Sequence, residues 1–260
     1  MKAKAIRNIP TLAMCALALF LTGRAAGADD WKISVTPYAW VTNIGVDATL
    51  GGRQVIDKQI PASDLLAVLD TIFQGRVEAT HGSFGAAVDF FDVTLSNEVS
   101  GMTLPQGAGS ADLTSDVGMT ILDVEGVYDP KGDGKGLSIL YGSRVLNQRA
   151  TIDASFGLVS GATVPQSYAV DDWMIDALAG VRFRKSLSRH WGFQIQADAS
   201  TGSTDYTWSV APLLTYSFGK SGRYELTGGY RRMTMDFRED GDVGAQMTLS
   251  GALVGFRMTF

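Results

Sequence analysis

Long stretches of this chain alternate between apolar and polar residues, and this feature constrains its fold more than any other. In the segment WGFQIQADAS, residues 191–200, every second residue from Trp191 to Ala199 is apolar, and most of the residues between them are polar. A period of two is that of a β-strand, because successive side chains point to opposite faces. Residues 171–185 and 205–218 repeat the pattern. Each segment has about ten residues or more, enough to cross a bilayer as a tilted strand.

The alternation predicts ten antiparallel strands joined as a meander. We expect them at about 31–42, 71–80, 84–96, 114–128, 137–147, 171–185, 190–201, 205–218, 223–237 and 244–260. The connections alternate between short turns, such as HGS at 81–83, and longer segments. Outer-membrane barrels have short periplasmic turns and longer outer loops, so both chain ends are expected on the periplasmic side. Eight or twelve strands stay open, because residues 151–170 could form their own hairpin and the first strand could continue through Leu50.

Alternation alone does not say whether the apolar face points inward, as in a soluble barrel, or toward lipid. Charged residues recur in mid-strand on the polar face, which suits a water-containing lumen. The chain also ends on an alternating strand, and Phe256, Met258 and Phe260 resemble the signal read by outer-membrane assembly machinery. Aromatic residues fall at strand ends as two interfacial girdles: Trp31, Trp191, Tyr216, Phe218 and Phe260 at one edge, and Trp40, Trp173 and Trp208 at the other. We therefore expect a membrane barrel.

The first 28 residues have the pattern of a secretory signal peptide. Basic residues precede an apolar run from about Thr11 to Leu21, and the small residues Ala26 and Ala28 mark a cleavage site after Ala28. The run is too short for a transmembrane helix. A lipoprotein anchor at Cys15 is disfavoured, because Met14 stands where that processing needs a small side chain.

Removal of this segment leaves a chain without cysteine, since Cys15 is the only one, so no disulfide is expected. The net charge falls from −5 to −9, because the segment holds four basic residues and no acid. Such a chain is not expected to bind nucleic acid. No later stretch approaches the roughly 20 apolar residues of a membrane helix. Residues 29–260 are therefore predicted to form one barrel domain.

The segment PASDLLAVLD, residues 61–70, does not alternate. Its leucines and Val68 follow Ser63 and Asp64, which predicts one or two helical turns with an N-cap. The helix could pack on the rim, or it could fold into the lumen as a partial plug.

Several short motifs resemble a family of uncharacterised proteobacterial outer-membrane β-barrel proteins. The motifs are PYAW (37–40), SDLLAVLD (63–70), VEATHGSFGAAVDF (77–90), AGVR (179–182), HWGFQIQADAS (190–200), GGYRR (228–232) and the closing strand. The resemblance covers essentially the whole mature chain and implies export and a barrel, without an established substrate. The chain departs from the family at Arg232, where an aromatic residue is expected, so the outward face of that strand is expected to be less regular.

If the polar face lines the lumen, thirteen charged residues point inward: Arg76, Glu78, Asp89, Asp123, Glu125, Arg144, Asp176, Arg182, Arg184, Asp198, Glu225, Arg231 and Arg257. The near balance of acids and bases favours a neutralising network that fills the lumen, because Arg can pair with several carboxylates. A polar pathway for a small hydrophilic solute is the other reading. Four of these arginines follow a glycine by two residues, as in Gly142-Ser143-Arg144, so the glycines are expected to make room for the arginine stems or for kinks.

Catalysis and metal binding find little support in the sequence. The two histidines, His81 and His190, fall in predicted turns, and spacing places no serine or acid beside either. No cofactor or metal is expected. Acidic residues of the outer segments could share divalent cations with lipopolysaccharide, although solvated loop charges are the simpler reading: Asp57, Asp64, Asp70, Glu98, Asp112, Asp116, Asp153, Asp171, Asp172, Glu239, Asp240 and Asp242.

The sequence thus predicts an all-β, transmembrane, antiparallel up-and-down barrel in the outer membrane of a Gram-negative cell. Its expected role is structural, at the cell surface, or that of a narrow porin-like channel for small polar solutes. An outer-membrane enzyme acting on lipid or peptide is the disfavoured alternative. The expected partners are membrane lipid, lipopolysaccharide and the outer-membrane assembly machinery.

Overall fold

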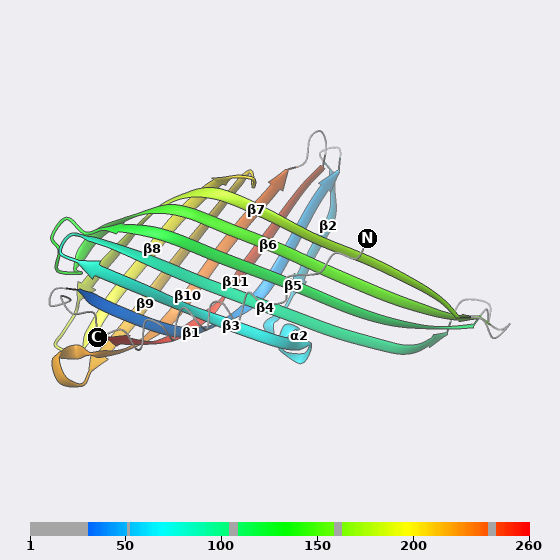
Figure 1. The fold of residues 1–260 in the computed structure, drawn as a ribbon, viewed down its shortest axis with the longest axis horizontal. Helices are drawn as coiled ribbons and strands as arrows, with labels where there is room; N and C mark the ends of the chain where they lie inside the picture. The colour runs from blue at the N-terminus through cyan, green and yellow to red at the C-terminus, as the bar shows by residue number, and fades with distance from the viewer. Residues whose placement is uncertain (1–30, 51–52, 104–108, 159–162, 239–242) are drawn as a thin grey trace. The chain divides into compact units, whose positions relative to one another are not determined.

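Ten antiparallel strands close into a barrel, and an eleventh strand pairs outside the closed ring (Figure 1). The computed structural model describes residues 31–50, 53–103, 109–158, 163–238 and 243–260. The predicted signal segment, with Cys15, Ala26 and Ala28, lies outside these residues. The elements are β1 Lys32–Leu50, β2 Arg53–Ile60, α2 Ala62–Ala67, β3 Leu69–His81, β4 Phe84–Thr103, β5 Gly109–Tyr128, β6 Gly136–Leu158, β7 Thr163–Ser186, β8 Trp191–Gly202, β9 Tyr206–Phe218, η2 Lys220–Gly222, β10 Tyr224–Arg238 and β11 Val243–Thr259.

The barrel closes by pairing its first strand with its last. Ser34 of β1 lies opposite Thr259 of β11, and the register runs to Leu50 opposite Val243. The backbone N–H of Phe260 donates to the carbonyl of Ile33 at 2.8 Å. All other neighbours in the ring are consecutive apart from β1 and β3, since β2 pairs only with the far part of β1. The predicted ten-strand meander is confirmed, and so is the continuation of the first strand to Leu50.

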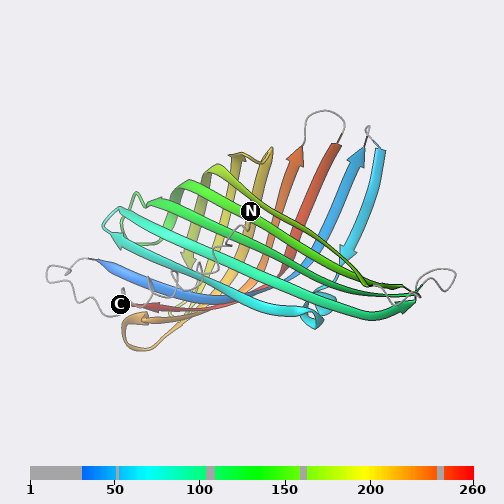
Figure 2. The same cartoon turned by 45° about the vertical axis from the view of Figure 1, so that its right-hand side comes forward.

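Four strands run far beyond the predicted bounds. Residues 97–113 and 148–170, which we expected to be long connections, belong mostly to β4, β5, β6 and β7. Their outer parts form a four-stranded extension past the rest of the barrel (Figures 1 and 2). They remain paired along their length, for example Thr114 opposite Asp153. Pairing satisfies the hydrogen-bonding groups of the backbone in these segments. Strands that do not contact lipid need no apolar face, so the alternation of apolar and polar residues could not reveal them.

The connection from β1 to β3 also contains regular structure. β2 folds back on β1 from Arg53, opposite Leu50, to Ile60, opposite Ile44. The predicted helix is α2, but the position before its first turn is Pro61, and neither Ser63 nor Asp64 caps it. Instead the backbone N–H groups of Asp64 and Leu65 bond the Pro61 carbonyl, at 3.1 and 3.3 Å.

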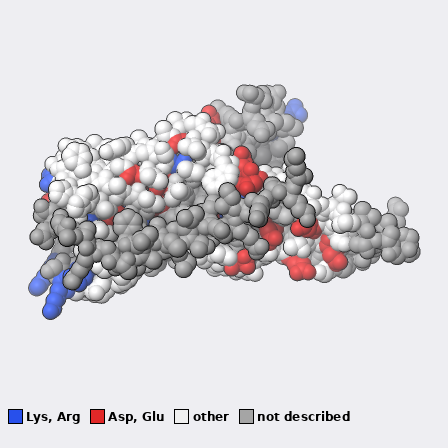
Figure 3. Space-filling view, viewed as in Figure 1, with Lys and Arg blue, Asp and Glu red and all other residues white. Residues whose placement is uncertain are grey.

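The outward face of the wall is apolar. Val181 on β7, for instance, lies between Ile139 of β6 and Ala197 of β8, and it is 45% exposed. Figure 3 shows a mostly uncharged surface over part of the barrel, with a few scattered charges, and acidic side chains over the extension. Arg232 interrupts the apolar face of β10 and places its guanidinium 5.8 Å from the Trp208 ring centre. No helix in the described ranges is long and apolar enough to cross a membrane.

The interior contains an apolar layer that the sequence reading did not anticipate. Buried side chains from most strands of the ring form one cluster: Trp40, Phe91, Ile121, Leu146, Met174, Ala211, Leu213, Met233, Met235, Leu249 and Leu253. The assignment of Trp40 to an interfacial girdle was wrong, since its ring is 2% exposed and stands inside, 5.5 Å from the Phe91 ring. The lumen therefore has an apolar part and a charged part.

Candidate functional site

The charged part of the lumen is built from side chains on the inner faces of eight strands. All thirteen residues predicted to point inward lie there, buried or nearly so: Arg76, Glu78, Asp89, Asp123, Glu125, Arg144, Asp176, Arg182, Arg184, Asp198, Glu225, Arg231 and Arg257. The two-residue period gives them a common face. Barrel closure then brings strands distant in sequence within reach of one another.

The largest ion-paired group joins opposite sides of the ring. Arg182 of β7 donates to both carboxylate oxygens of Glu78 on β3, at 2.5 and 2.8 Å. Arg76, two residues before Glu78, donates to Glu78 at 3.1 Å and to Glu125 of β5 at 2.6 Å. Its other nitrogen lies 3.6 Å from Asp89 of β4. Two arginines and three carboxylates thus share one desolvated space, in which each charge has an opposite partner.

A second group is centred on Arg144, the most enclosed charge of the lumen. Its Nε and Nη2 donate to the two oxygens of Asp123 on β5, each at 2.7 Å. The Nη2 group also donates to Asp198 of β8 at 2.9 Å. Arg144 is on β6, so its planar fork ties three strands together.

A third group connects the charges to the apolar layer. Asp89 accepts a hydrogen bond from the Tyr38 hydroxyl at 2.7 Å, and Arg231 of β10 lies 3.9 Å from the same carboxylate. The Arg231 guanidinium lies 4.8 Å from the Trp40 ring centre, within cation–π range. The Trp40 indole N–H in turn donates to the Arg231 carbonyl at 3.3 Å.

The remaining predicted charges are held by local partners. Arg257 pairs with Glu225 on the neighbouring strand at 3.2 Å. Arg184 donates to Gln194 at 2.6 Å. Asp176 accepts from the Ser200 hydroxyl at 3.1 Å and from the Thr204 backbone N–H at 3.0 Å.

Tyr38, Gln74 and Gln194 also line the polar part of the lumen. The alternation placed Gln194 on the polar face, whereas it did not single out Tyr38 or Gln74. Tyr38 and Trp40 continue the face of Ser34 and Thr36 along β1, whereas the residues between them are apolar or small. That alternation was available in the sequence. This alternation was not recognised because two aromatic residues, taken alone, suggest a lipid-facing surface.

At three of the four Gly-x-Arg triplets the glycine allows neighbouring strands to pack closely. A Cβ atom on Gly142 would lie 2.0 Å from the Val124 carbonyl oxygen, and one on Gly229 would lie 2.2 Å from that of Pro212. Gly180 is similarly close to the Ala197 carbonyl, at 2.8 Å. These three positions let adjacent backbones approach closely and do not serve to make room for guanidinium groups, whereas the nearest neighbour of a Cβ atom on Gly255 would be the Tyr38 Cβ atom, at 3.2 Å.

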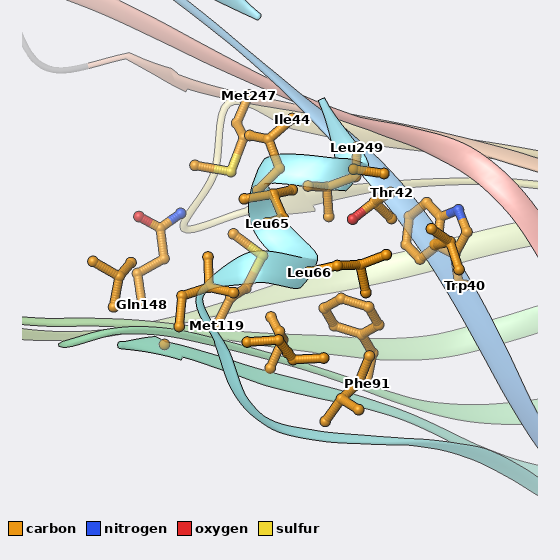
Figure 4. Close-up of a pocket in the computed structure, with 18 of the residues that line it drawn as sticks. Trp40, Thr42, Ile44, Leu65, Leu66, Phe91, Met119, Gln148, Met247 and Leu249 are labelled. Atoms are coloured by element: carbon orange, nitrogen blue, oxygen red, sulfur yellow. The ribbon is translucent and has the colours of Figure 1, made fainter. Parts of the chain in front are cut away.

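Next to the apolar layer lies a cavity of about 320 Å³ (Figure 4). The side chains of Leu65 and Leu66 point from α2 into it, facing Phe91 and Met119 across the space. Trp40 forms part of its lining. Hence α2 helps to enclose this space from its edge, since none of the helix residues is fully buried.

His81 ends β3, and His190 precedes β8 with its Nδ1 3.0 Å from the Ser217 carbonyl. Within the described ranges, no group of three or more His, Cys, Asp or Glu side chains could hold a metal ion. At the end of the chain, the Phe256 ring lies 5.9 Å from that of Tyr224, and the Phe260 side chain is exposed. Glu239, Asp240 and Asp242 lie outside the described residues.

A closed antiparallel barrel with an apolar exterior defines the protein as a transmembrane β-barrel. No protein-family model and no curated protein sequence matches the chain. The solved structures similar to it include the attachment invasion locus protein Ail of Yersinia pestis, with 12% identity, 88% of this chain and 99% of that chain covered, and a TM-score of 0.33. They also include the toluene transporter TodX of Pseudomonas putida, with 8% identity, 88% of this chain and 89% of that chain covered, and a TM-score of 0.40. The outer membrane protease OmpT of Escherichia coli is similar with 9% identity, 92% of this chain and 99% of that chain covered, and a TM-score of 0.41. The resemblance to one particular family stays a prediction.

Proposed function

We propose that the protein is an integral outer-membrane β-barrel with a closed lumen, which serves as a structural, surface-presenting element and not as a pore. Its apolar outer wall supports the membrane location, because a soluble protein rarely exposes so large an apolar surface. The outward residues include Val88, Val124, Ile139, Ile175, Val181, Leu214, Leu226 and Val254, all at least 42% exposed.

The edges of the apolar wall support the same location. Near the short turns, outward aromatic rings gather, with Trp191 5.1 Å from Tyr216 and Phe218 5.7 Å from Tyr224. Toward the extension, the wall changes to polar side chains, where Asp92 accepts from Arg149 at 3.0 Å and from Thr120. An aromatic band on one side and a polar row on the other suit the two bilayer interfaces. We assign the short turns to the periplasm and the extension to the outside.

The observation that carries the closed lumen is the bidentate Arg182–Glu78 pair, which crosses the barrel. The apolar cluster adds a second obstacle, since ions pass an apolar constriction poorly. The void described within the charged zone is small, about 70 Å³. Most charges of the lining are paired with an opposite charge, whereas an ion-selective pore is expected to favour one sign.

Planar-bilayer recording tests this proposal. Protein shown to be folded by heat-modifiable migration on a gel should give no unitary conductance in salt solution. A reproducible unitary conductance from folded protein would favour instead the narrow channel for small polar solutes. Arg182→Ala is a further probe. In a plugged barrel the substitution should lower the stability of the fold, seen as a loss of the heat-modifiable gel form. In an open barrel it should mainly change the unitary conductance.

The acidic extension suits a surface role. Exposed acids on its strands include Glu98, Asp112 and Asp153, and they would stand near the lipopolysaccharide headgroups. We propose membrane lipid and lipopolysaccharide as its surroundings, and the assembly machinery as the reader of Phe256, Met258 and Phe260. A lipid- or peptide-directed enzyme remains disfavoured, since nothing in the sequence pattern of His81 or His190 supplies a nucleophile and base.

A further inference from the structure

We propose that the cavity beneath α2 binds one alkyl chain carrying an oxygen-containing head group, which enters from the bilayer between β1 and β3. The inference rests on the membrane location proposed above, but it is independent of whether the lumen conducts. Its grounds are an interruption in the barrel wall, the lining of the cavity and one buried polar group.

The wall is interrupted because β1 and β3 pair over only a short length. Their register runs from Lys32 opposite Thr80 to Pro37 opposite Gly75. Farther along, β1 pairs with β2 from Ile44 onward, while the remainder of β3 pairs only with β4. Residues 38–43 of β1 and 69–74 of β3 therefore have no ladder with each other in the described part of the chain.

One side chain replaces the missing ladder at the edge of this gap. Gln74 of β3 accepts a hydrogen bond from the Trp40 backbone N–H at 2.5 Å, and its amide group donates to the Trp40 carbonyl at 3.4 Å. The carboxamide thus takes the place of a peptide group of the adjacent strand. The gap proper begins beyond Trp40, toward Asn43.

The helix α2 spans the gap. The chain reaches it from Ile60, which is paired to β1, and leaves it at Leu69, which is paired to β4. The Asn43 side chain accepts a hydrogen bond from the Ala62 N–H at 2.9 Å and so fixes the start of the helix to β1. A six-residue helix buries little surface and none of its residues is fully buried, so little packing opposes its displacement from the gap.

Some of the residues that line the cavity belong to the outward face of the wall. Most of its lining comes from inner-face residues such as Phe91, Val93 and Met119. Ala39 and Val41 also line it, although their positions on β1 belong to the outward face. Because outward-facing residues are part of its lining, the space opens sideways, close to the polar row of the wall, since Arg149 of that row also lines it.

The lining indicates the chemistry of the ligand. Nearly all of it is apolar, and the volume of about 320 Å³ is at the lower end of the range for small-molecule sites. The Nε2 group of Gln148, which is on the lining, is buried without a hydrogen-bond partner among the described residues. An unmade bond of this kind is costly, so a ligand oxygen that accepts from Gln148 would be favoured. A slender apolar chain ending in a carboxylate, ester or hydroxyl meets both conditions.

Quenching of Trp40 fluorescence tests the inference. The protein would be placed in lipid nanodiscs with Trp31, Trp173, Trp191 and Trp208 replaced by Phe, so that the buried Trp40 is the only emitter. A fatty acid brominated in mid-chain is added in one arm, and a phospholipid brominated in one acyl chain is built into the disc in the other. Saturable quenching is expected in at least one arm, and the arm in which it occurs identifies the source of the chain.

Two variants separate binding from contact with bilayer lipid. Ala150→Phe fills the cavity and should abolish quenching, whereas Ala199→Phe on the exposed outer face should leave it unchanged. Gln148→Leu should raise the half-quenching concentration by up to about tenfold, the equivalent of one hydrogen bond. Folded, disc-embedded protein without quenching, or with quenching that survives Ala150→Phe, would overturn the inference. Failure to embed in discs would instead count against the membrane location.

Discussion

Arg182 of β7 and Glu78 of β3 face each other across the lumen and are joined by two hydrogen bonds of 2.5 and 2.8 Å. Three strands separate β7 from β3 around the ring, and 104 residues separate the pair in sequence. The contact therefore exists only after the sheet has curled and closed. It links barrel closure to charge neutralisation, since either carboxylate or guanidinium alone would be a buried charge.

Arg182→Ala is expected to destabilise the barrel by about 3 kcal/mol, the lower end of the range for breaking a buried pair. The low end applies because Glu78 keeps Arg76 as a second partner. The measurement is the urea midpoint of folding in lipid vesicles, followed by the shift between folded and unfolded gel mobility. Arg189→Ala, at an exposed turn position, is the matched control and should be neutral. Equal midpoints for the two variants would show that the cross-lumen pair does not stabilise the fold.

Arg144→Lys should also be destabilising, although it keeps the charge. An ammonium group cannot reproduce the planar fork that bonds both oxygens of Asp123 and one of Asp198. We expect a loss of about 1–3 kcal/mol in the same urea titration, from carboxylate bonds left unmade at a fully enclosed site. A variant as stable as the parent would mean that charge alone, and not bond geometry, holds β5, β6 and β8 together here.

Two adjacent glycines on β10 provide a matched test of strand spacing. Gly229→Ala would put a Cβ atom 2.2 Å from the Pro212 carbonyl oxygen, so overpacking should cost about 1–3 kcal/mol. A Cβ atom on Gly228 meets nothing within 4 Å, and Gly228→Ala should be neutral or slightly stabilising, because it restricts the unfolded chain. Folding yield and urea midpoint would be compared. Similar values for both variants would contradict the close backbone approach.

The sequence was most informative where one face meets lipid. On β8 and β9 the two-residue period separated inward Gln194 and Asp198 from outward Trp191 and Leu214. The same rule could not say what each face touches. Met233 and Met235 of β10 are fully buried inside the barrel, as inner apolar residues that a simple polar-in, apolar-out rule does not predict.

Other features depend on register and closure and leave little local signal. Arg182 could be placed on the inner face from its own strand, but its partner Glu78 could not be named, because the partner depends on how the ring closes. The strand β2 has exposed residues on both faces from Arg53 to Gln59, so no period-two contrast marks it. The alternation did not mark the extension of β4–β7 either, because paired strands that do not contact lipid need no apolar face.

Charge placed on the outer wall tests the membrane location directly. Val181→Arg puts a guanidinium among the exposed side chains of the apolar band, beside Ile139 and Ala197. For lipid-facing positions near the bilayer midplane the cost is about 2–4 kcal/mol, and it falls toward the interfaces. Leu187→Arg, in the turn after β7, is the control and should fold as well as the parent, because that exposed position is at the end of the strand. Folding into vesicles, scored by gel mobility, should be impaired for Val181→Arg alone. If it folds like the Leu187 variant, this face of the wall does not meet hydrocarbon.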